Sequence, residues 1–284
     1  MPDWSALSNV SFLAIAAILL IGVPHGGLDG AVARRVGWPN GILPWVLFHL
    51  IYLLLAASVA GLWWLYPLPS LMFFLLISAV HFGSSDIRHI DAPSARAAWL
   101  PLVAHGGLVV IAIPVLQSAA VEPLFAALVG ADNSLWLLQQ IDQLLLPWGL
   151  SVFAYVIYTV YQPRWRGPLL NLIVLIALAY LLPPLVSFAL YFCLWHSRSH
   201  MLRIWRSIAT DQRARSARET IAYSLLAYAA GAVYWFYYRG DLASLTALPP
   251  ALLQLTFIGL AALTVPHMLL VDIVHGQRDK EHYD

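Results

Sequence analysis

The sequence predicts an all-α integral membrane protein, because its composition is far more apolar than that of a soluble domain. Hydrophobic residues make up 61% of the 284 residues, and charged residues make up only 10%. Soluble domains contain about 25% charged residues. The mean hydropathy of +0.76 indicates the same environment. We therefore expect membrane lipid around the chain, and the net charge of +1 supports no nucleic-acid partner.

Nine stretches are long and apolar enough to cross a bilayer, which requires about 20 mostly apolar residues. They lie at residues 9–33, 41–65, 69–87, 97–118, 135–161, 167–182, 184–206, 217–238 and 250–275. Pro183 and Pro184 predict a tight break between the sixth and seventh stretches. Residues 119–134, which include Glu122 and Asp132, are expected to form a loop with at most one interfacial turn. Since no repeat or polar domain is visible, residues 1–284 are expected to form a single polytopic membrane domain.

The basic residues predict the orientation, because Lys and Arg collect on the cytoplasmic side of a membrane. Basic residues follow the first, third, fifth, seventh and ninth stretches, whereas the loops after the second, fourth and sixth have none. The loop after the eighth has only Arg239. This alternation predicts about nine transmembrane helices in the inner (cytoplasmic) membrane, with the N-terminus outside and the C-terminus cytoplasmic. Residues 1–9 contain Asp3 and no basic residue, so we expect no cleavable signal peptide.

Five histidines lie within the predicted spans, where an ionisable side chain indicates a functional site because its burial in lipid is costly. They are His25, His81, His196, His200 and His267. Imidazole is the commonest metal ligand among side chains. His196 and His200 are four residues apart, so both rings share one helix face. The pattern predicts a histidine-ligated metal inside the membrane.

The predicted topology also places these rings at a common depth. Three of them precede the next basic residue by about 10–17 Å along their helices, and the histidine pair lies just before Arg203. His49 and His105 fall at comparable depths, and we interpret them as structural.

The side chains available restrict the kind of metal site. Imidazoles without thiolates suit Zn, Cu, Fe or Ni. The single cysteine, Cys193, lies in an apolar run and is expected to be buried and inert. A desaturase would need several HxxxH clusters, and this chain has one. The only lysine is Lys280, so a rhodopsin with a retinal Schiff base in the membrane is excluded.

Further residues are candidates for supporting such a site. Asp29 lies one turn beyond His25, and Asp86 follows His81 in the segment HFGSSD. We expect these carboxylates to hold imidazole N–H groups, as metal-bound histidines usually require; the alternative is a solvated helix end. Pro24 and its neighbouring glycines predict a break in the first helix, where another helix can approach closely.

Aromatic residues beside the histidine pair suggest how an apolar substrate would be bound. Tyr191, Phe192 and Trp195 are expected to line a substrate channel, although lipid-facing or core positions are equally compatible with the sequence. His267 follows a proline, and three roles stay open for it: metal ligand, hydrogen-bond donor beside the metal, or contact between helices.

Four segments together resemble the Brp/Blh family of bacterial and archaeal β-carotene dioxygenases. They are PHGGLD at 24–29, HFGSSD at 81–86, YFCLWHSRSH at 191–200 and PHMLLVD at 266–272. The resemblance implies a membrane enzyme that uses Fe(2+) and O₂ to cleave the central double bond of β-carotene, giving two retinal molecules. It also implies a set of iron ligands, with His267 supporting them rather than binding the metal. These ligands are His25, His81, His196 and His200.

Two other functions are compatible with the residues alone. Facing histidines can act as the axial ligands of a haem-binding membrane electron carrier. A non-catalytic carotenoid-binding accessory protein would hold the pigment without forming retinal. Transporters usually show paired repeats, and none is visible here.

Overall fold

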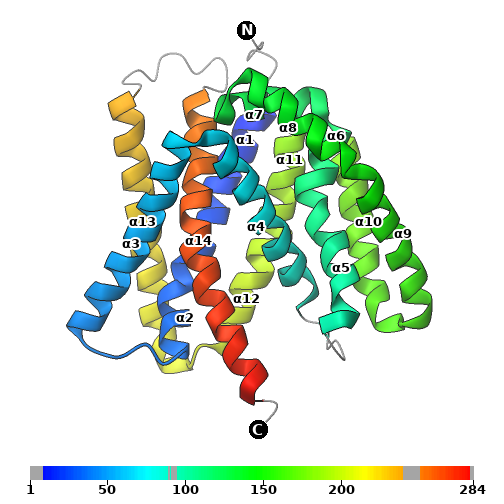
Figure 1. The fold of residues 1–284 in the computed structure, drawn as a ribbon. Coiled ribbons are helices and arrows are strands. Elements are labelled where there is room, and N and C mark those ends of the chain that lie inside the picture. The colour runs from blue at the N-terminus through cyan, green and yellow to red at the C-terminus, as the bar shows by residue number, and fades with distance from the viewer. Residues whose placement is uncertain (1–8, 89, 91–94, 239–249, 282–284) are drawn as a thin grey trace.

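The structure, a computed structural model, describes residues 9–88, 90, 95–238 and 250–281, and those residues form a helical bundle without strands (Figure 1). The first predicted span is one irregular helical stretch. It consists of α1 (Asn9–Ala17), the π-helix η2 (Ile18–Gly22), the 3₁₀-helix η3 (Val23–Leu28) and α2 (Asp29–Arg35). The predicted break at Pro24 is therefore a change of helix type, and the chain continues in the same direction.

The next spans begin and end close to their predicted bounds. α3 (Ile42–Leu65) and α4 (Pro67–Ile87) are regular. The fourth span is irregular again, and it consists of α5 (Ala95–Gly107), the π-helix η4 (Leu108–Ala112) and α6 (Ile113–Leu116).

The prediction of a loop at residues 119–134 is wrong. α7 (Ser118–Val129) and α8 (Ala131–Gln143) occupy this region and are separated by Gly130, whose φ is 87°. The acidic residues that suggested a loop lie on the polar faces of two short amphipathic helices. Val121, Leu128 and Leu137 are buried in one apolar cluster with Trp63 of α3. Such packing, rather than local propensity, stabilises helices of this length.

The second half of the chain follows the predicted order. α9 (Leu145–Tyr161), η5 (Pro163–Trp165) and α10 (Arg166–Leu181) are followed by the confirmed break at Pro183. The seventh stretch joins α11 (Pro184–Ala189), the π-helix η6 (Leu190–Ser197) and α12 (Arg198–Ser207). The short η7 (Thr210–Gln212) leads to α13 (Arg213–Tyr238), and α14 (Pro250–Glu281) ends the described chain.

Seven helices in the described part of the chain are long and apolar enough to cross a membrane. The chain is therefore a multi-pass, all-α membrane protein. Two of the nine predicted spans, at residues 184–206 and 217–238, are helical but are not among the seven. α1 begins and α14 ends at opposite ends of the bundle (Figure 1).

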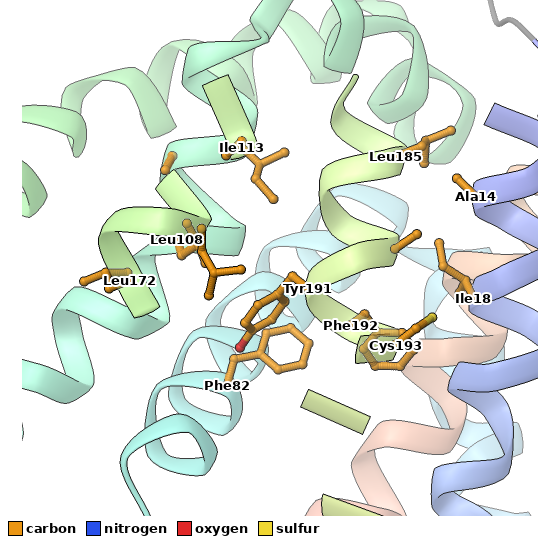
Figure 2. Packing of buried hydrophobic residues seen from close by; sticks show 14 of the residues in the cluster. Ala14, Ile18, Phe82, Leu108, Ile113, Leu172, Leu185, Tyr191, Phe192 and Cys193 are labelled. Atoms are coloured by element: carbon orange, nitrogen blue, oxygen red, sulfur yellow. The ribbon is translucent and has the colours of Figure 1, made fainter. Parts of the chain in front are cut away.

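The apolar core joins the first and the seventh stretches. Figure 2 shows Ala14 and Ile18 next to side chains of the α11–η6 stretch, including Leu185 and Cys193. Cys193 is a free, buried thiol, as predicted, and its Sγ lies 3.3 Å from the carbonyl oxygen of Ala17. These contacts fix η6 against η2, and both elements adjoin the histidine-bearing segments.

Two kinds of contact hold further helices in place around the core: a close helix crossing and an ion pair. α4 and α5 cross closely at Gly83 and Gly106, where an added Cβ would lie 2.4 Å and 2.3 Å from backbone oxygens of the opposite helix. On the other side of the bundle, Arg34 of α2 forms an ion pair of 2.8 Å with Glu219 of α13. Small residues and polar contacts are the usual determinants of helix packing in membranes.

We predict that Gly83→Val destabilises the protein markedly, because the new side chain meets backbone that cannot move aside. Overpacking typically costs about 1–3 kcal/mol. Thermal unfolding in detergent measures the effect, and Gly61→Val is the matched control, since nothing lies within 4 Å of a Cβ at Gly61. Equal stability of the two variants would contradict this close crossing.

Candidate metal centre

The five membrane histidines converge on one place in the bundle. η3 positions His25, α4 positions His81, η6 and α12 position the HxxxH pair, and α14 positions His267. The ring centroid of His25 lies 5.8 Å from that of His196, 5.9 Å from that of His200 and 5.1 Å from that of His267. His81 lies 4.9 Å from His196 and 5.7 Å from His267 by the same measure. The prediction that helices distant in sequence bring these residues together is confirmed.

The HxxxH pair has the arrangement that its spacing predicts. The His196 and His200 rings are nearly parallel, with an interplanar angle of 10° and centroids 6.3 Å apart. His200 is also 4.9 Å from His267 by ring centroids. Both members of the pair therefore face the same group of rings.

These separations fit rings that surround one ion. Two imidazoles that bind one metal at about 2.1 Å and a tetrahedral angle have centroids about 5 Å apart. No three His, Cys, Asp or Glu side chains in the described residues are already arranged to hold a metal ion. The rings are thus close enough to share an ion, but the side chains must rotate before their nitrogens point at a common position.

Several ring nitrogens at this place have no hydrogen-bond partner although they are buried. They are both nitrogens of His196, Nε2 of His200 and Nε2 of His267. An unpaired buried polar group costs about 1–3 kcal/mol. A metal ion is a group that can accept lone pairs from several such nitrogens at once, so the donor set fits a metal.

Asp29 supports the cluster, but through a different histidine from the one expected. Its Oδ1 accepts a hydrogen bond of 2.7 Å from Nδ1 of His267, and its Oδ2 accepts one of 2.9 Å from the Tyr52 hydroxyl. The His25 ring instead bonds the carbonyl oxygen of Gly22 through Nδ1. Each arrangement fixes a tautomer whose Nε2 is left as a possible metal donor, as metal-bound histidines require.

The environment of Asp29 also calls for a positive charge. The residue is 2% exposed, and within the described residues no Lys or Arg forms an ion pair with it. A buried carboxylate without a counter-charge is costly. A cation held by His267 would provide that charge.

Asp86 lies next to the cluster without bonding one of its five histidines. Its Oδ2 accepts hydrogen bonds from the Tyr191 hydroxyl, at 3.1 Å, and from Nδ1 of His105, at 3.3 Å. Asp86 thus links α4 to η6 and α5, and its contact with the five histidines is indirect. Tyr191 is buried against Phe82 (Figure 2), with ring centroids 5.3 Å apart.

The two other aromatic candidates occupy different surroundings. Phe192 stacks between Phe188 and His196, with interplanar angles of 10° to both. Trp195 is half-buried and lines a cavity of about 570 Å³ together with Asp86, His105 and Arg203. That cavity touches His196, and most of its lining residues are polar.

Non-standard helix geometry positions two of the histidine segments. His25 lies on the 3₁₀-helix that follows a π-helix, and His196 lies near the end of a π-helix of 8 residues. π-Helical turns are rare and often occur at functional sites. Gly27 allows α13 to approach η3, because a Cβ there would lie 3.0 Å from the backbone of Thr220. The close approach expected at these glycines is confirmed.

The family model for beta-carotene 15,15'-dioxygenase matches residues 16–275 of this chain. The chain belongs to the beta-carotene 15,15'-dioxygenase family. A protein of that name from an uncultured marine bacterium, 66A03, is 36% identical over 293 residues, which cover 96% of this chain and 98% of that protein. No solved structure matches the chain significantly.

A second relative of this dioxygenase family comes from Halobacterium salinarum and is named a probable beta-carotene 15,15'-dioxygenase Blh. It is 25% identical over 298 residues, which cover 90% of this chain and 82% of the relative. The resemblance seen in four short segments is therefore confirmed over nearly the whole chain.

Sequence reasoning missed several residues around this histidine cluster. Tyr52 gave no signal, because an aromatic residue in an apolar helix is unremarkable, yet it bonds Asp29. His49 and His105 were interpreted as structural, and they bond Tyr223 and Asp86 respectively. Their predicted depth in the membrane is comparable to that of the ligand candidates, and this shared depth is the sequence signal that could have identified them.

If the cluster binds a metal ion, we predict that Asp29→Asn lowers its affinity for added Fe(II) by about 10- to 100-fold, the usual effect of losing a carboxylate behind a metal-bound histidine. The amide keeps the shape but loses the charge. Anaerobic competition with a chelator measures the affinity. Asp142→Asn is the control, because Asp142 is exposed; equal affinities in both variants would show that Asp29 does not act on the metal.

Proposed function

We propose that this protein cleaves the central double bond of β-carotene with O₂ and releases two molecules of retinal. The reaction would take place at a ferrous ion held by His25, His81, His196 and His200. The observation that carries the proposal is the convergence of buried imidazoles from widely separated helices, beside an apolar cavity. Family membership supports the same reaction, since both relatives are named for it.

Each part of the site has a task in this proposal. Activation of O₂ is the chemistry that a ferrous ion supplies when bound. His25, His81, His196 and His200 would hold the ion as neutral imidazoles, which would not cancel its positive charge. A hydrocarbon substrate offers no hydrogen bonds, so the shape of the apolar cavity must place the reacting bond next to the ligands. Buried aromatic and aliphatic side chains around the rings keep water away from the reacting atoms.

The contacts of His267 favour a role as a metal ligand over the supporting role that the resemblance implies. Its Nδ1 is held by Asp29 and its Nε2 has no hydrogen-bond partner. Its ring is adjacent to His25, His81 and His200. We therefore propose that His267 is an additional ligand or replaces one of the four.

The packing of the rings does not favour a haem carrier. Two axial histidines would hold the iron from opposite sides, and the macrocycle would need a wide flat gap between their rings. Here five rings are grouped with the centroids of neighbouring histidines 4.9–6.3 Å from each other, so further imidazoles occupy the space that a macrocycle would need. A compact group of this kind suits a single ion.

We further propose that all nine predicted spans cross the cytoplasmic membrane, with the N-terminus outside. Residues 184–207 and α13 would cross the membrane in addition to the seven helices that are apolar enough by composition. These two are of comparable length to the seven. Their lower hydropathy reflects the histidines and arginines of residues 196–206 and the arginines and Glu219 at the start of α13. The opposite positions of the start of α1 and the end of α14 support an odd number of crossings (Figure 1).

In a host that produces β-carotene, we predict retinal formation by the wild-type protein and near-complete loss, at least 100-fold, for His196→Ala. The variant should also lose bound iron, measured in the purified protein. His105→Ala is the control for iron content, since its ring bonds Asp86 and lies outside the cluster. Iron loss in His105→Ala as severe as in His196→Ala would refute the ligand set, and pigment binding without retinal would indicate an accessory protein.

A topology experiment separates nine crossings from seven. We predict that alkaline phosphatase fused after Asp211 is inactive, because nine crossings place this turn in the cytoplasm. If residues 184–207 and α13 do not cross, the same fusion is outside and active. A fusion after Gly130 is the positive control, because both topologies place it outside.

A further inference from the structure

An apolar cleft runs away from the histidines between α3, α13 and α14. Next to the rings, a cavity of about 350 Å³ is lined by His25, His267 and Tyr52, among others. Farther along the same helices, a cavity of about 1030 Å³ is lined by Trp63, Trp235 and other residues. Both volumes are those of ligand-binding pockets, which typically measure about 300–1,000 Å³.

The two cavities are continuous. Five residues line both of them, and they come from η3, α13 and α14: Val23, Ala227, Ala230, Leu260 and Leu263. Along α14 the combined lining extends from Leu252 to His267, a length of about 22 Å at 1.5 Å per residue. We call this combined space the α3–α13 cleft.

The chemistry of the cleft is that of a hydrocarbon site. Among the described residues, no Asp, Glu, Lys, Arg or His lines its outer cavity. Small residues such as Ala60, Ala227 and Gly231 keep it open along both walls. At its inner end, Nε2 of His49 lies 2.8 Å from the Tyr223 hydroxyl, so a hydrogen bond joins α3 to α13 there.

The cleft is also open sideways. Leu53 of α3 and Leu226 of α13 line its inner cavity and are 64% and 66% exposed. In a bilayer these side chains face acyl chains, so a lipid-dissolved molecule can enter without passing through water.

We propose that the α3–α13 cleft binds one half of the carotenoid, with its polyene next to His25 and His267 and its ring end towards Trp63 and Trp235. This inference rests on the proposed function and adds where the substrate lies. An elongated molecule without polar groups matches the length, the apolar outer cavity and the lateral opening. The aromatic residues Tyr191, Phe192 and Trp195 line neither cavity of the cleft, so the substrate would contact α3 and α13 instead.

The test is a side chain placed where the two cavities join. Ala230→Phe fills this junction, and we expect at least a tenfold loss of retinal formation. Retention of β-carotene by the purified protein without O₂, where no turnover occurs, should fall at least tenfold as well. Bound iron should match that of wild type, because Ala230 contacts no ligand.

Ala229→Phe is the matched control. This residue is adjacent in sequence, exposed, and lines neither cavity, so retinal formation and carotenoid retention should equal those of wild type. Ala227→Phe, which also lines both cavities, is the second variant should Ala230→Phe fail to fold.

The outcomes separate this inference from the proposed function. If a folded junction variant retains β-carotene and forms retinal as well as the wild-type protein does, the cleft is not the carotenoid site. Lipid acyl chains would then occupy the cleft. An absence of retinal from the wild-type protein would overturn the proposed function, whereas loss of anaerobic carotenoid retention in Ala230→Phe alone would still support the cleft.

Discussion

The burial of imidazoles and a carboxylate among apolar helices is the constraint on which this fold depends. Asp29, His196 and His267 are each no more than 2% exposed. Several nitrogens of the cluster have no partner in the protein, at a cost of about 1–3 kcal/mol for each. Helix packing alone gains nothing from such groups, because leucine at these positions would pack without the penalty. A cation that bound the free nitrogens and offset the carboxylate would remove this cost and stabilise the folded state.

The same constraint explains why two of the histidine-bearing segments are irregular. A regular α-helix repeats every 3.6 residues, and it presents each side chain only in a fixed direction. The π-helix η6 and the 3₁₀-helix η3 change that direction over one or two turns, and they carry His196 and His25. Tight packing against neighbouring segments holds these turns in place, as at Gly27 beside Thr220.

The sequence predicted the helical class and the converging histidines because both depend on short-range patterns. Runs of apolar residues locate spans, and the i,i+4 spacing of His196 and His200 places both rings on one face. The partner of Asp29 was not predictable in the same way. His267 is 238 residues away, and only the packed fold determines that this ring, rather than that of nearby His25, meets the carboxylate. The helices α7 and α8 were missed for a related reason, since buried contacts stabilise them and their composition resembles a loop.

The surroundings of the cluster differ from one side to another, and this difference bears on how the reactants reach it. His25 and His267 face the α3–α13 cleft, whose lining is mostly apolar and which opens towards lipid. His196 faces a cavity that Asp86, His105 and Arg203 make polar. A carotenoid is excluded from the polar cavity by the cost of leaving charged groups unsolvated, whereas small polar molecules are not. The cluster thus separates a hydrocarbon environment from a polar one. The product of a hydrocarbon substrate is more polar than the substrate itself. It is therefore solvated differently in the cleft on one side of the histidines and in the polar cavity on the other.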